Sequence, residues 1–176
     1  FKECESWARK ALDMALGRGG DQVAIKQGDA FEFYGGVSKG VEKRDKVRTR
    51  VIASTLSDHV KESDRVFIMG HHFSDLDCVG ASVGMYSAIT KGQDRPAHVV
   101  INREKTLAVS LVKSIDAAGA GGMFLSPEQA MSMVTDRSLL IIVDTHSQSF
   151  LESPALYERC KRVVVIDHHR MMVNHI

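Results

Sequence analysis

Three short, largely apolar runs in this 176-residue chain each end in a cluster of acidic and histidine residues. The runs cover residues 65–70, 139–143 and 163–166. They lead into His71-His72-Phe73-Ser74-Asp75-Leu76-Asp77, Asp144-Thr145-His146 and Asp167-His168-His169, respectively. Short runs rich in β-branched residues predict buried strands. Because ligands of open α/β sheets bind beyond the carboxyl ends of the strands, these three strand ends predict one shared site.

From Asp64 onward the pattern alternates between strands and helices. The predicted strands cover 65–70, 97–101, 138–143 and 162–166, and the predicted helices cover about 77–91, 106–118, a segment from Ser126 and a segment from Ser153. Ser126, Pro127 and Gln129 have the spacing of a capping box with proline at the first helical position. Continuous apolar strands separated by helices predict an α/β fold, with a mostly parallel sheet and helices on both faces.

The first third of the chain has a different pattern. Residues 1–16 predict an amphipathic helix, and residues 23–25 and 31–34 predict two short strands around a turn at 27–29. This short α+β segment is too small for a core of its own, so we expect it to be the end of a preceding domain. Residues 37–62 are highly charged and predict a connecting helix whose apolar positions dock on one face. Its basic residues fit a solvated helix face better than a phosphate-binding stripe.

Composition excludes several classes of function. A formal net charge of +1 gives no electrostatic reason to expect long nucleic acid or a membrane surface as a partner. No apolar run approaches the ~20 residues that span a bilayer, and the first residues do not form a signal-peptide pattern. Cys4, Cys78 and Cys160 form no C-x-x-C pair, so we interpret them as small, partly buried apolar side chains in a reducing cytoplasm.

The acid and histidine residues are suitable metal ligands. His71, Asp75 and Asp77 lie in a strand-to-helix loop, where His71 and Asp75 can converge on one ion and Asp77 on a neighbouring one. Asp144 can bridge the two positions, and His168 can complete the second. Carboxylate and imidazole together suit Mn²⁺, Fe²⁺ or Zn²⁺, and two such ions ~3.5–4 Å apart can stabilise a phosphoryl displacement. The alternative for Asp75 and Asp77 is that they only cap the following helix.

These residues carry a family resemblance over about residues 62–176. The matching segments are His71-x-x-x-Asp75-x-Asp77-x-x-Gly80-Ala81, Asp144-Thr145-His146 and Asp167-His168-His169-Arg170. In this order they resemble motifs I, II and III of the DHH phosphoesterase family. That family includes single-strand exonucleases, oligoribonucleases, cyclic dinucleotide phosphodiesterases and family II pyrophosphatases.

The upstream residues narrow the resemblance. Residues 11–24 and 33–36 resemble the junction in GdpP-type cyclic di-AMP phosphodiesterases, in which a degenerate GGDEF domain precedes the DHH domain. The resemblance divides the chain into 1–36, the end of a GGDEF-like domain, 37–62, a connecting helix, and 63–176, the DHH domain. Gly19-Gly20-Asp21-Gln22 matches the GGDEF signature only in spelling, because it follows a helix near the end of that domain. We therefore assign it no cyclase role and interpret it as a helix stop and turn.

The resemblance also implies roles for individual residues. His71, Asp75 and Asp144 would hold a first Mn²⁺, and Asp77, Asp144 and His168 a second. His169 would face the scissile phosphate and, with Asp144, form the catalytic pair. Asp167 would orient an imidazole from behind the ligands. His72 occupies a variable family position and is assigned no role, and His146 is expected near the site without being a ligand.

Two departures from the family pattern stand out. Ser147-Gln148-Ser149 replaces the basic residue and proline that often follow the second motif, which we expect to alter substrate contacts. In the family, a further Asp ligand and the DHHA1 domain follow the third motif. This chain starts at Phe1 and ends at Ile176, so we expect it to be a piece of a longer protein, with the DHHA1 domain missing and only part of the cleft present.

The resemblance implies hydrolysis of cyclic di-AMP to the linear dinucleotide pApA by a hydroxide that two Mn²⁺ ions activate. The expected partner is a cyclic dinucleotide, with homodimerisation in the intact protein. The expected location is the cytoplasmic side of a protein anchored in the membrane upstream of Phe1, with no membrane contact by these residues. Two alternatives remain: a DHH-family oligoribonuclease acting on short linear RNAs, which the GGDEF-like segment disfavours, and a non-catalytic, metal-binding regulatory fragment.

Overall fold

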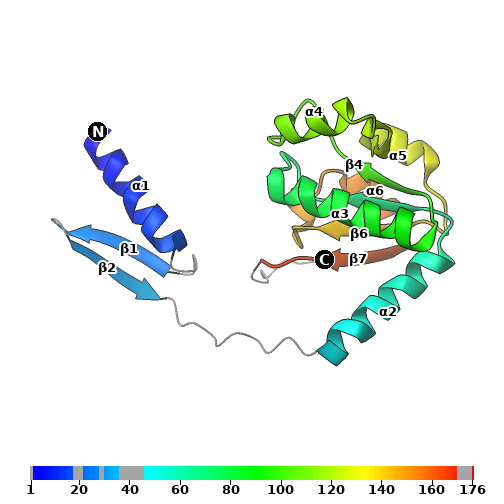
Figure 1. Ribbon diagram of the computed structural model, residues 1–176, viewed down its shortest axis with the longest axis horizontal. Helices are drawn as coiled ribbons and strands as arrows, with labels where there is room; N and C mark the ends of the chain where they lie inside the picture. The colour runs from blue at the N-terminus through cyan, green and yellow to red at the C-terminus, as the bar shows by residue number, and fades with distance from the viewer. Residues whose placement is uncertain (1, 18–21, 28–29, 36–45, 170–175) are drawn as a thin grey trace. The chain divides into compact units, whose positions relative to one another are not determined.

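The computed structural model describes residues 2–17, 22–27, 30–35, 46–169 and 176 (Figure 1). The chain divides into two compact units, residues 1–46 and 47–176. None of the helices in the described ranges is both long enough and apolar enough to cross a membrane. The segment Gly19-Gly20-Asp21-Gln22, whose letters resemble the GGDEF signature, lies outside the described residues except for Gln22.

The first unit contains one helix and one hairpin. Helix α1 covers Lys2–Gly17, and β1 (Gln22–Gln27) pairs antiparallel with β2 (Ala30–Gly35). The predicted helix and strands are therefore confirmed, although the turn at 28–29 lies outside the described residues. Ala11 and Ala15 are buried, whereas Trp7 and Leu12 are exposed. The apolar face predicted for this helix is thus only partly covered within its own unit.

Helix α2 covers Lys46–Glu62, which confirms a helix in the second part of the segment 37–62. Residues 37–45 lie outside the described residues. The prediction that its apolar positions dock along one face is correct only near its end. Val60 is fully buried and Leu56 is half-buried against the sheet. Val51 and Ile52 are more than half exposed. A helical pattern shows which positions share a face, but it does not show whether another element covers them.

The second unit is built on a five-stranded parallel sheet. Its strands are β3 (Val66–Met69), β4 (Ala97–Val100), β5 (Phe124–Leu125), β6 (Leu139–Val143) and β7 (Arg162–Ile166). Their order is β5-β4-β3-β6-β7, and every neighbouring pair is parallel. The α/β prediction is confirmed. Strand β5 was not predicted, because two residues are too few to show a strand period.

Four helices and two short 3-10 turns connect these strands. They are α3 (Leu76–Gln93), α4 (Val109–Ala117), α5 (Pro127–Met133), α6 (Pro154–Arg159), η1 (Gly121–Met123) and η2 (Gln148–Phe150). The predicted capping box is confirmed, since the Gln129 N–H donates to the Ser126 hydroxyl and the Gln129 side chain accepts from the Ser126 N–H.

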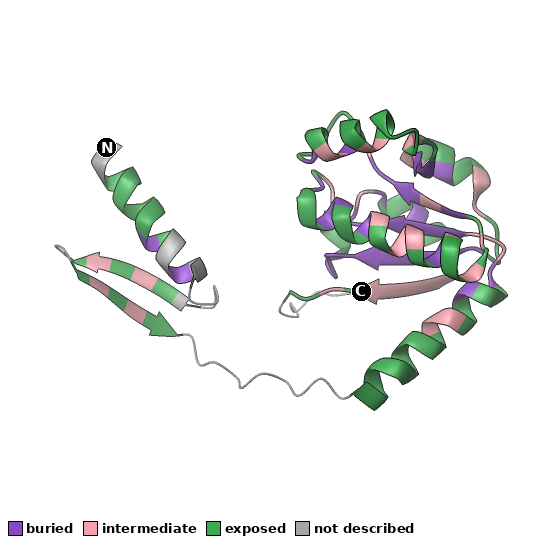
Figure 2. Cartoon of the chain, viewed as in Figure 1, coloured by how far each residue is buried: buried purple, intermediate pink, exposed green. Residues whose placement is uncertain are grey.

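Alternate residues of the strands pack on opposite faces of the sheet, as the two-residue period of a strand requires. On one face Val66, Ile68 and Ile141 pack with residues of α2 and α3. On the other face Phe67 and Leu140 pack with four residues of α5 and α6, namely Ala130, Met133, Leu156 and Tyr157. The buried band in Figure 2 therefore runs along β3, β4 and β6, with helices on both sides. The prediction of a buried strand is wrong for β7, which is only partly buried because it is the edge strand of the sheet.

The connectivity of the sheet places the site. From β3 the chain moves outward through β4 to β5, then returns to the other side of β3 as β6. Because the connections diverge on either side of the β3–β6 pair, the loops leave an open crevice at the carboxyl ends of these two strands. His71 lies just beyond β3 and Asp144 immediately follows β6, so both stand at this crevice.

Candidate metal centre and active site

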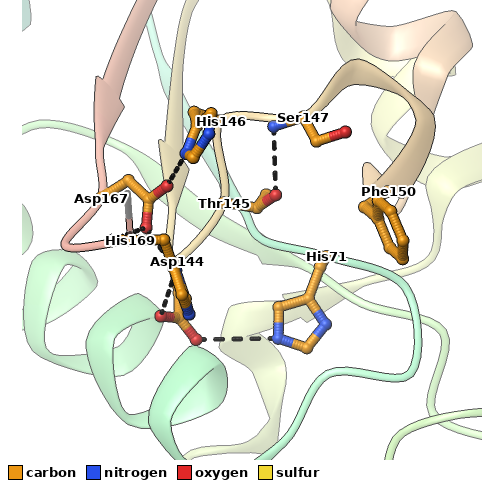
Figure 3. Close-up of a pocket in the computed structure, with 8 residues that line it drawn as sticks. All are labelled: His71, Asp144, Thr145, His146, Ser147, Phe150, Asp167 and His169. Atoms are coloured by element: carbon orange, nitrogen blue, oxygen red, sulfur yellow. Dashed lines mark hydrogen bonds and ion pairs between the residues drawn. The ribbon is translucent and has the colours of Figure 1, made fainter. Parts of the chain in front are cut away.

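Asp144 lies at the centre of the site. Its backbone adopts a left-handed conformation with φ of 60°, which aspartate tolerates better than most residues, and its N–H donates to the Ile166 carbonyl at 3.0 Å. Its side chain is only 6% exposed. One carboxylate oxygen lies 3.6 Å from His71 Nε2, and the other lies 3.2 Å from His168 Nε2. The carboxylate of Asp144 thus faces imidazoles from two different strand ends, as a bridging ligand would (Figure 3 shows the pair with His71).

His71 presents one ring nitrogen to the site. Its Nδ1 lies 2.9 Å from the His72 carbonyl oxygen, so Nδ1 carries the proton and donates to that carbonyl. This tautomer leaves the Nε2 lone pair directed at the carboxylates, 3.6 Å from Asp144 and 3.9 Å from Asp75. Fixing one nitrogen with a backbone carbonyl is the usual arrangement for a histidine that ligates metal through the other.

Asp75 and Asp77 lie at the start of α3. One Asp75 oxygen accepts from the N–H groups of Asp77 and Cys78, each at 3.0 Å, so Asp75 is the N-cap of the helix. The same oxygen lies 3.9 Å from His71 Nε2. Asp77 is exposed, and its carboxylate lies 3.6 Å from His168 Nε2. Asp75 therefore caps α3, as the alternative expected, and the same oxygen also lies near His71.

Asp167 holds two imidazoles behind the site. Its Oδ2 pairs with His146 Nδ1, and its Oδ1 accepts from the His169 ring at 2.7 Å and from the His169 N–H at 3.1 Å. Burial acts to raise the pKa of Asp167, but the hydrogen bonds from His146 and His169 prevail and lower it to about 2. The Asp167 carboxylate in turn raises the pKa of His169. His169 Nδ1 also lies 3.8 Å from Asp144.

Two sets of potential ligands converge in the described part of the chain. In each set one donor atom per residue lies within 4.8 Å of the others: His71, Cys78 and Asp144 form one set, and Asp144, His168 and His169 form the other. Both sets combine imidazole with carboxylate, which suits Mn²⁺, Fe²⁺ or Zn²⁺. The shared Asp144 and the donor chemistry fit two neighbouring divalent ions.

Cys78 is the residue that the sequence did not single out. The interpretation as a small apolar side chain describes its burial, since it is 2% exposed and burial raises the pKa of its thiol to about 12. Its sulfur nevertheless lies among the donors of the first set, and Asp75 does not complete that set. Its position could have identified it as a candidate site residue. Cys78 follows Asp77 directly, in the first turn of α3, and that turn begins at the carboxyl edge of the sheet.

A cavity of about 440 Å³ opens beside these residues (Figure 3). It is lined by His71, Asp144, Thr145, His146, Ser147, Phe150, Asp167 and His169. Ser147 belongs to the segment that departs from the family pattern, and Phe150 follows that segment in η2. All the predicted site residues thus lie in one region, while the roles assigned to them remain predictions.

Comparisons with known proteins find a matching family model and several similar curated proteins. A family model described as the DHH family, N-terminal domain, matches residues 65–176. The cyclic-di-AMP phosphodiesterase GdpP of Geobacillus thermodenitrificans is 42% identical over 172 residues, covering 96% of this chain and 26% of the relative. The cyclic-di-AMP phosphodiesterase PdeA of Listeria monocytogenes is 41% identical, covering 93% of this chain and 25% of the relative.

A third relative is a membrane protein–large ribosomal subunit bL9 fusion protein of Onion yellows phytoplasma. It is 30% identical over 97% of this chain and 21% of its own length. The chain therefore spans about a quarter of the length of the curated relatives it matches. With the motifs at three strand ends and a family match over most of its length, the chain belongs to the DHH family.

Proposed function

We propose that this chain supplies the metal-binding site of a phosphodiesterase that hydrolyses cyclic di-AMP to the linear dinucleotide pApA. The observation that carries the proposal is Asp144, whose two oxygens face His71 and His168 from different strand ends. The names of the relatives at 41–42% identity support this choice of substrate.

The proposed ligands fall into two groups around Asp144. His71, Asp75 and Asp144 would hold one Mn²⁺, and Cys78 would lie beside these three ligands. Asp77, Asp144 and His168 would hold the other. When bound, the two ions supply Lewis-acid chemistry, because they withdraw charge from the phosphoryl oxygens and acidify the attacking water.

The protein's own residues position the groups that react. Water attacks the phosphorus, the bond from phosphorus to a ribose 3′ oxygen breaks, and the products are a 3′ hydroxyl and a 5′ phosphate. His169 contacts a phosphoryl oxygen while Asp167 holds its other ring nitrogen. His146 pairs with the second oxygen of Asp167, which limits the ways that carboxylate can turn. Preorganised donors of this kind stabilise charge that develops in the transition state.

The protein context is part of the same proposal. We propose that residues 1–36 are the end of a GGDEF-like domain and that residues 37–62 connect it to a DHH domain over 63–176. The match to the GdpP relative supports this, since it covers 96% of the chain and so includes most of the first unit. We also propose a homodimer on the cytoplasmic side of a membrane-anchored protein; the phytoplasma relative's name as a membrane protein supports the anchoring.

Hydrolysis of cyclic di-AMP in the presence of Mn²⁺ tests the proposal. We expect linear pApA as product from the intact protein, and loss of turnover in Asp144→Asn. Asp136→Asn is a matched control, because Asp136 precedes β6 and pairs with Arg159 and Lys161 on the surface. Faster turnover of short linear RNAs than of cyclic di-AMP would favour an oligoribonuclease. Metal binding without turnover of either substrate would favour a regulatory role.

A further inference from the structure

Three aromatic rings, from His72, Phe73 and Phe150, form a cluster here called the aromatic shelf, and Phe150 lines the cavity of the site. The His72 and Phe150 rings are stacked, with centroids 5.3 Å apart and planes 2° apart. The Phe73 ring meets His72 edge-on at 5.0 Å. Phe73 and Phe150 are each 51% exposed. Isolated exposed apolar residues are common on protein surfaces, but a cluster of rings of which one lines a cavity indicates a binding surface.

The backbone fixes the shelf in place. The His72 N–H donates to the Phe150 carbonyl at 2.8 Å, and His72 Nδ1 lies 3.0 Å from the same oxygen. His71 and Leu151 form an antiparallel bridge, and the Glu152 N–H donates to the Gly70 carbonyl at 3.0 Å. The segments that follow β3 and β6 are therefore joined to each other beside the metal ligands. A ligand that stacks on these rings would meet a surface that is already ordered.

Phe73 adopts a backbone conformation that phenylalanine rarely takes. Its φ is 55°, in the left-handed region, and the residue is half exposed rather than buried in the core. Strained residues of this kind cluster at sites where ligands bind. The strain and the exposure occur at the same residue, next to His71 and His72, so the loop holds a ring outward at the edge of the site.

The shelf is continuous with the candidate active site. Phe150 lines the same cavity as His71, Asp144, Asp167 and His169. In Figure 3 its ring stands beside His71, across the cavity from Asp167 and His146. A single ligand can therefore place a phosphate at Asp144 and a flat ring at Phe150.

We infer that the aromatic shelf is a stacking subsite for an unpaired purine base of the substrate whose phosphodiester lies at Asp144. This inference rests on the proposed function and deepens it. Every nucleobase has a π face that stacks on aromatic side chains, whereas inorganic pyrophosphate and polyphosphate have none. The shelf therefore selects nucleotides among the phosphoesters that DHH-family enzymes cleave. It is built from His72, which occupies a variable family position, and from Phe150, which follows Ser147-Gln148-Ser149, where this sequence departs from the family pattern.

Binding of AMP and of ribose 5-phosphate, each at a fixed Mn²⁺ concentration, separates the base from the phosphate. We expect Phe150→Ala and Phe73→Ala to weaken AMP binding by about 5- to 150-fold, the range for loss of one stacked base. Ribose 5-phosphate binding should not change. Phe150→Tyr should keep AMP affinity and Phe150→Leu should lose it, because leucine fills space without a π face. Met131→Ala, an exposed apolar residue on α5, is the control.

A fluorescent dinucleotide and steady-state kinetics complete the test. A 2-aminopurine dinucleotide should be quenched on binding to the wild type and should remain bright with Phe150→Ala. For cyclic di-AMP hydrolysis, KM should rise while kcat changes little. Equal weakening of AMP and ribose 5-phosphate, unchanged AMP affinity in both alanine variants, or a change of oligomeric state alone would overturn the stacking role.

The two proposals fail in different ways. Hydrolysis of cyclic di-AMP that is insensitive to Phe73 and Phe150 would overturn the shelf and leave the proposed function standing. Base-dependent binding that disappears in Phe150→Ala, in an intact protein that hydrolyses no cyclic dinucleotide, would support the shelf and overturn the proposed function.

Discussion

His71 Nε2 lies 3.6 Å from a carboxylate oxygen of Asp144, and this pair joins the ends of β3 and β6. These are the two strands between which the connectivity of the sheet changes direction. Because the second Asp144 oxygen faces His168, 3.2 Å away, one buried carboxylate connects candidate metal ligands from three strand ends. Changes at Asp144 should therefore affect the whole centre, and changes at peripheral ligands only part of it.

Asp144→Asn should reduce bound Mn²⁺ more than Asp77→Asn does. An amide offers one acceptor oxygen where the carboxylate offers two, so both positions are weakened, whereas exposed Asp77 serves one position. We expect activity to fall by roughly 100-fold or more in Asp144→Asn, in line with loss of several kcal/mol of transition-state stabilisation. Metal content after gel filtration measures the difference. Equal metal loss in the two variants would count against a shared role for Asp144.

Asp75 should show two separable roles. Asp75→Ala removes the N-cap of α3 and should lower the free energy of unfolding by about 1 kcal/mol, in addition to weakening Mn²⁺ binding. Asp75→Ser keeps an oxygen for the N–H groups of Asp77 and Cys78, so stability should recover while metal affinity does not. Thermal unfolding with and without Mn²⁺ measures both effects. Wild-type Mn²⁺ affinity in Asp75→Ser would show that Asp75 only caps the helix.

Asp64 should contribute to acid stability away from the metal centre. Burial acts to raise the pKa of Asp64, but hydrogen bonds from Thr135 and Ser138 prevail and lower it. The unfolded chain therefore binds this proton at a higher pH than the folded protein does. The contribution is fully present above the unfolded pKa of about 3.9 and is lost as pH falls through the lower folded value.

Asp64→Asn should make the free energy of unfolding less dependent on pH below about 4, the range set by the carboxyl reference pKa. It should also lower stability near neutral pH by about 1 kcal/mol, because an amide oxygen accepts these hydrogen bonds less strongly than a carboxylate does. Urea unfolding at several pH values provides the measurement. If the free energy of unfolding of Asp64→Asn falls as steeply at acid pH as that of the wild type, other carboxylates cause the acid dependence.

The three cysteines should differ sharply in reactivity. Cys4 is exposed, whereas burial raises the pKa of Cys78 to about 12 and that of Cys160 to about 11. Because the thiolate is the nucleophile, iodoacetamide at pH 8 should label Cys4 first and the other two only after unfolding. Mass spectrometry of peptides reports each site. Labelling of Cys78 as fast as Cys4 in the folded protein would contradict its burial beside Asp144.

The sequence predicted the sheet and the site edge well because both depend on local patterns. The apolar runs before His71, Asp144 and Asp167 are continuous, and parallel strands bring their carboxyl ends to one edge. Asp75 could not be assigned to one role, since the same spacing serves a helix cap and a metal ligand. The structure shows the cap and places the same oxygen 3.9 Å from His71 Nε2.

Other features depend on contacts between distant segments, which no local pattern reports. Phe150 reaches the cavity only because η2 is joined to His72, 78 positions away in the chain. In the sequence, Cys78 cannot be distinguished from an ordinary core residue. Its sulfur lies near Asp144 only because β6 packs beside the segment that contains Cys78. The first half of α2 is a similar case, because the helical spacing of its apolar residues predicts an apolar face but does not show whether another element covers that face.

Electron paramagnetic resonance of the Mn²⁺-loaded protein tests the central claim most directly, since the signal depends on whether one carboxylate links two ions. We predict the spectrum of an exchange-coupled pair in the wild type, replaced in Asp144→Asn by the six-line spectrum of isolated Mn²⁺ or by no bound signal. Asp136→Asn should retain the coupled spectrum. A wild-type protein that binds Mn²⁺ at saturation with only isolated, uncoupled spectra would contradict the account.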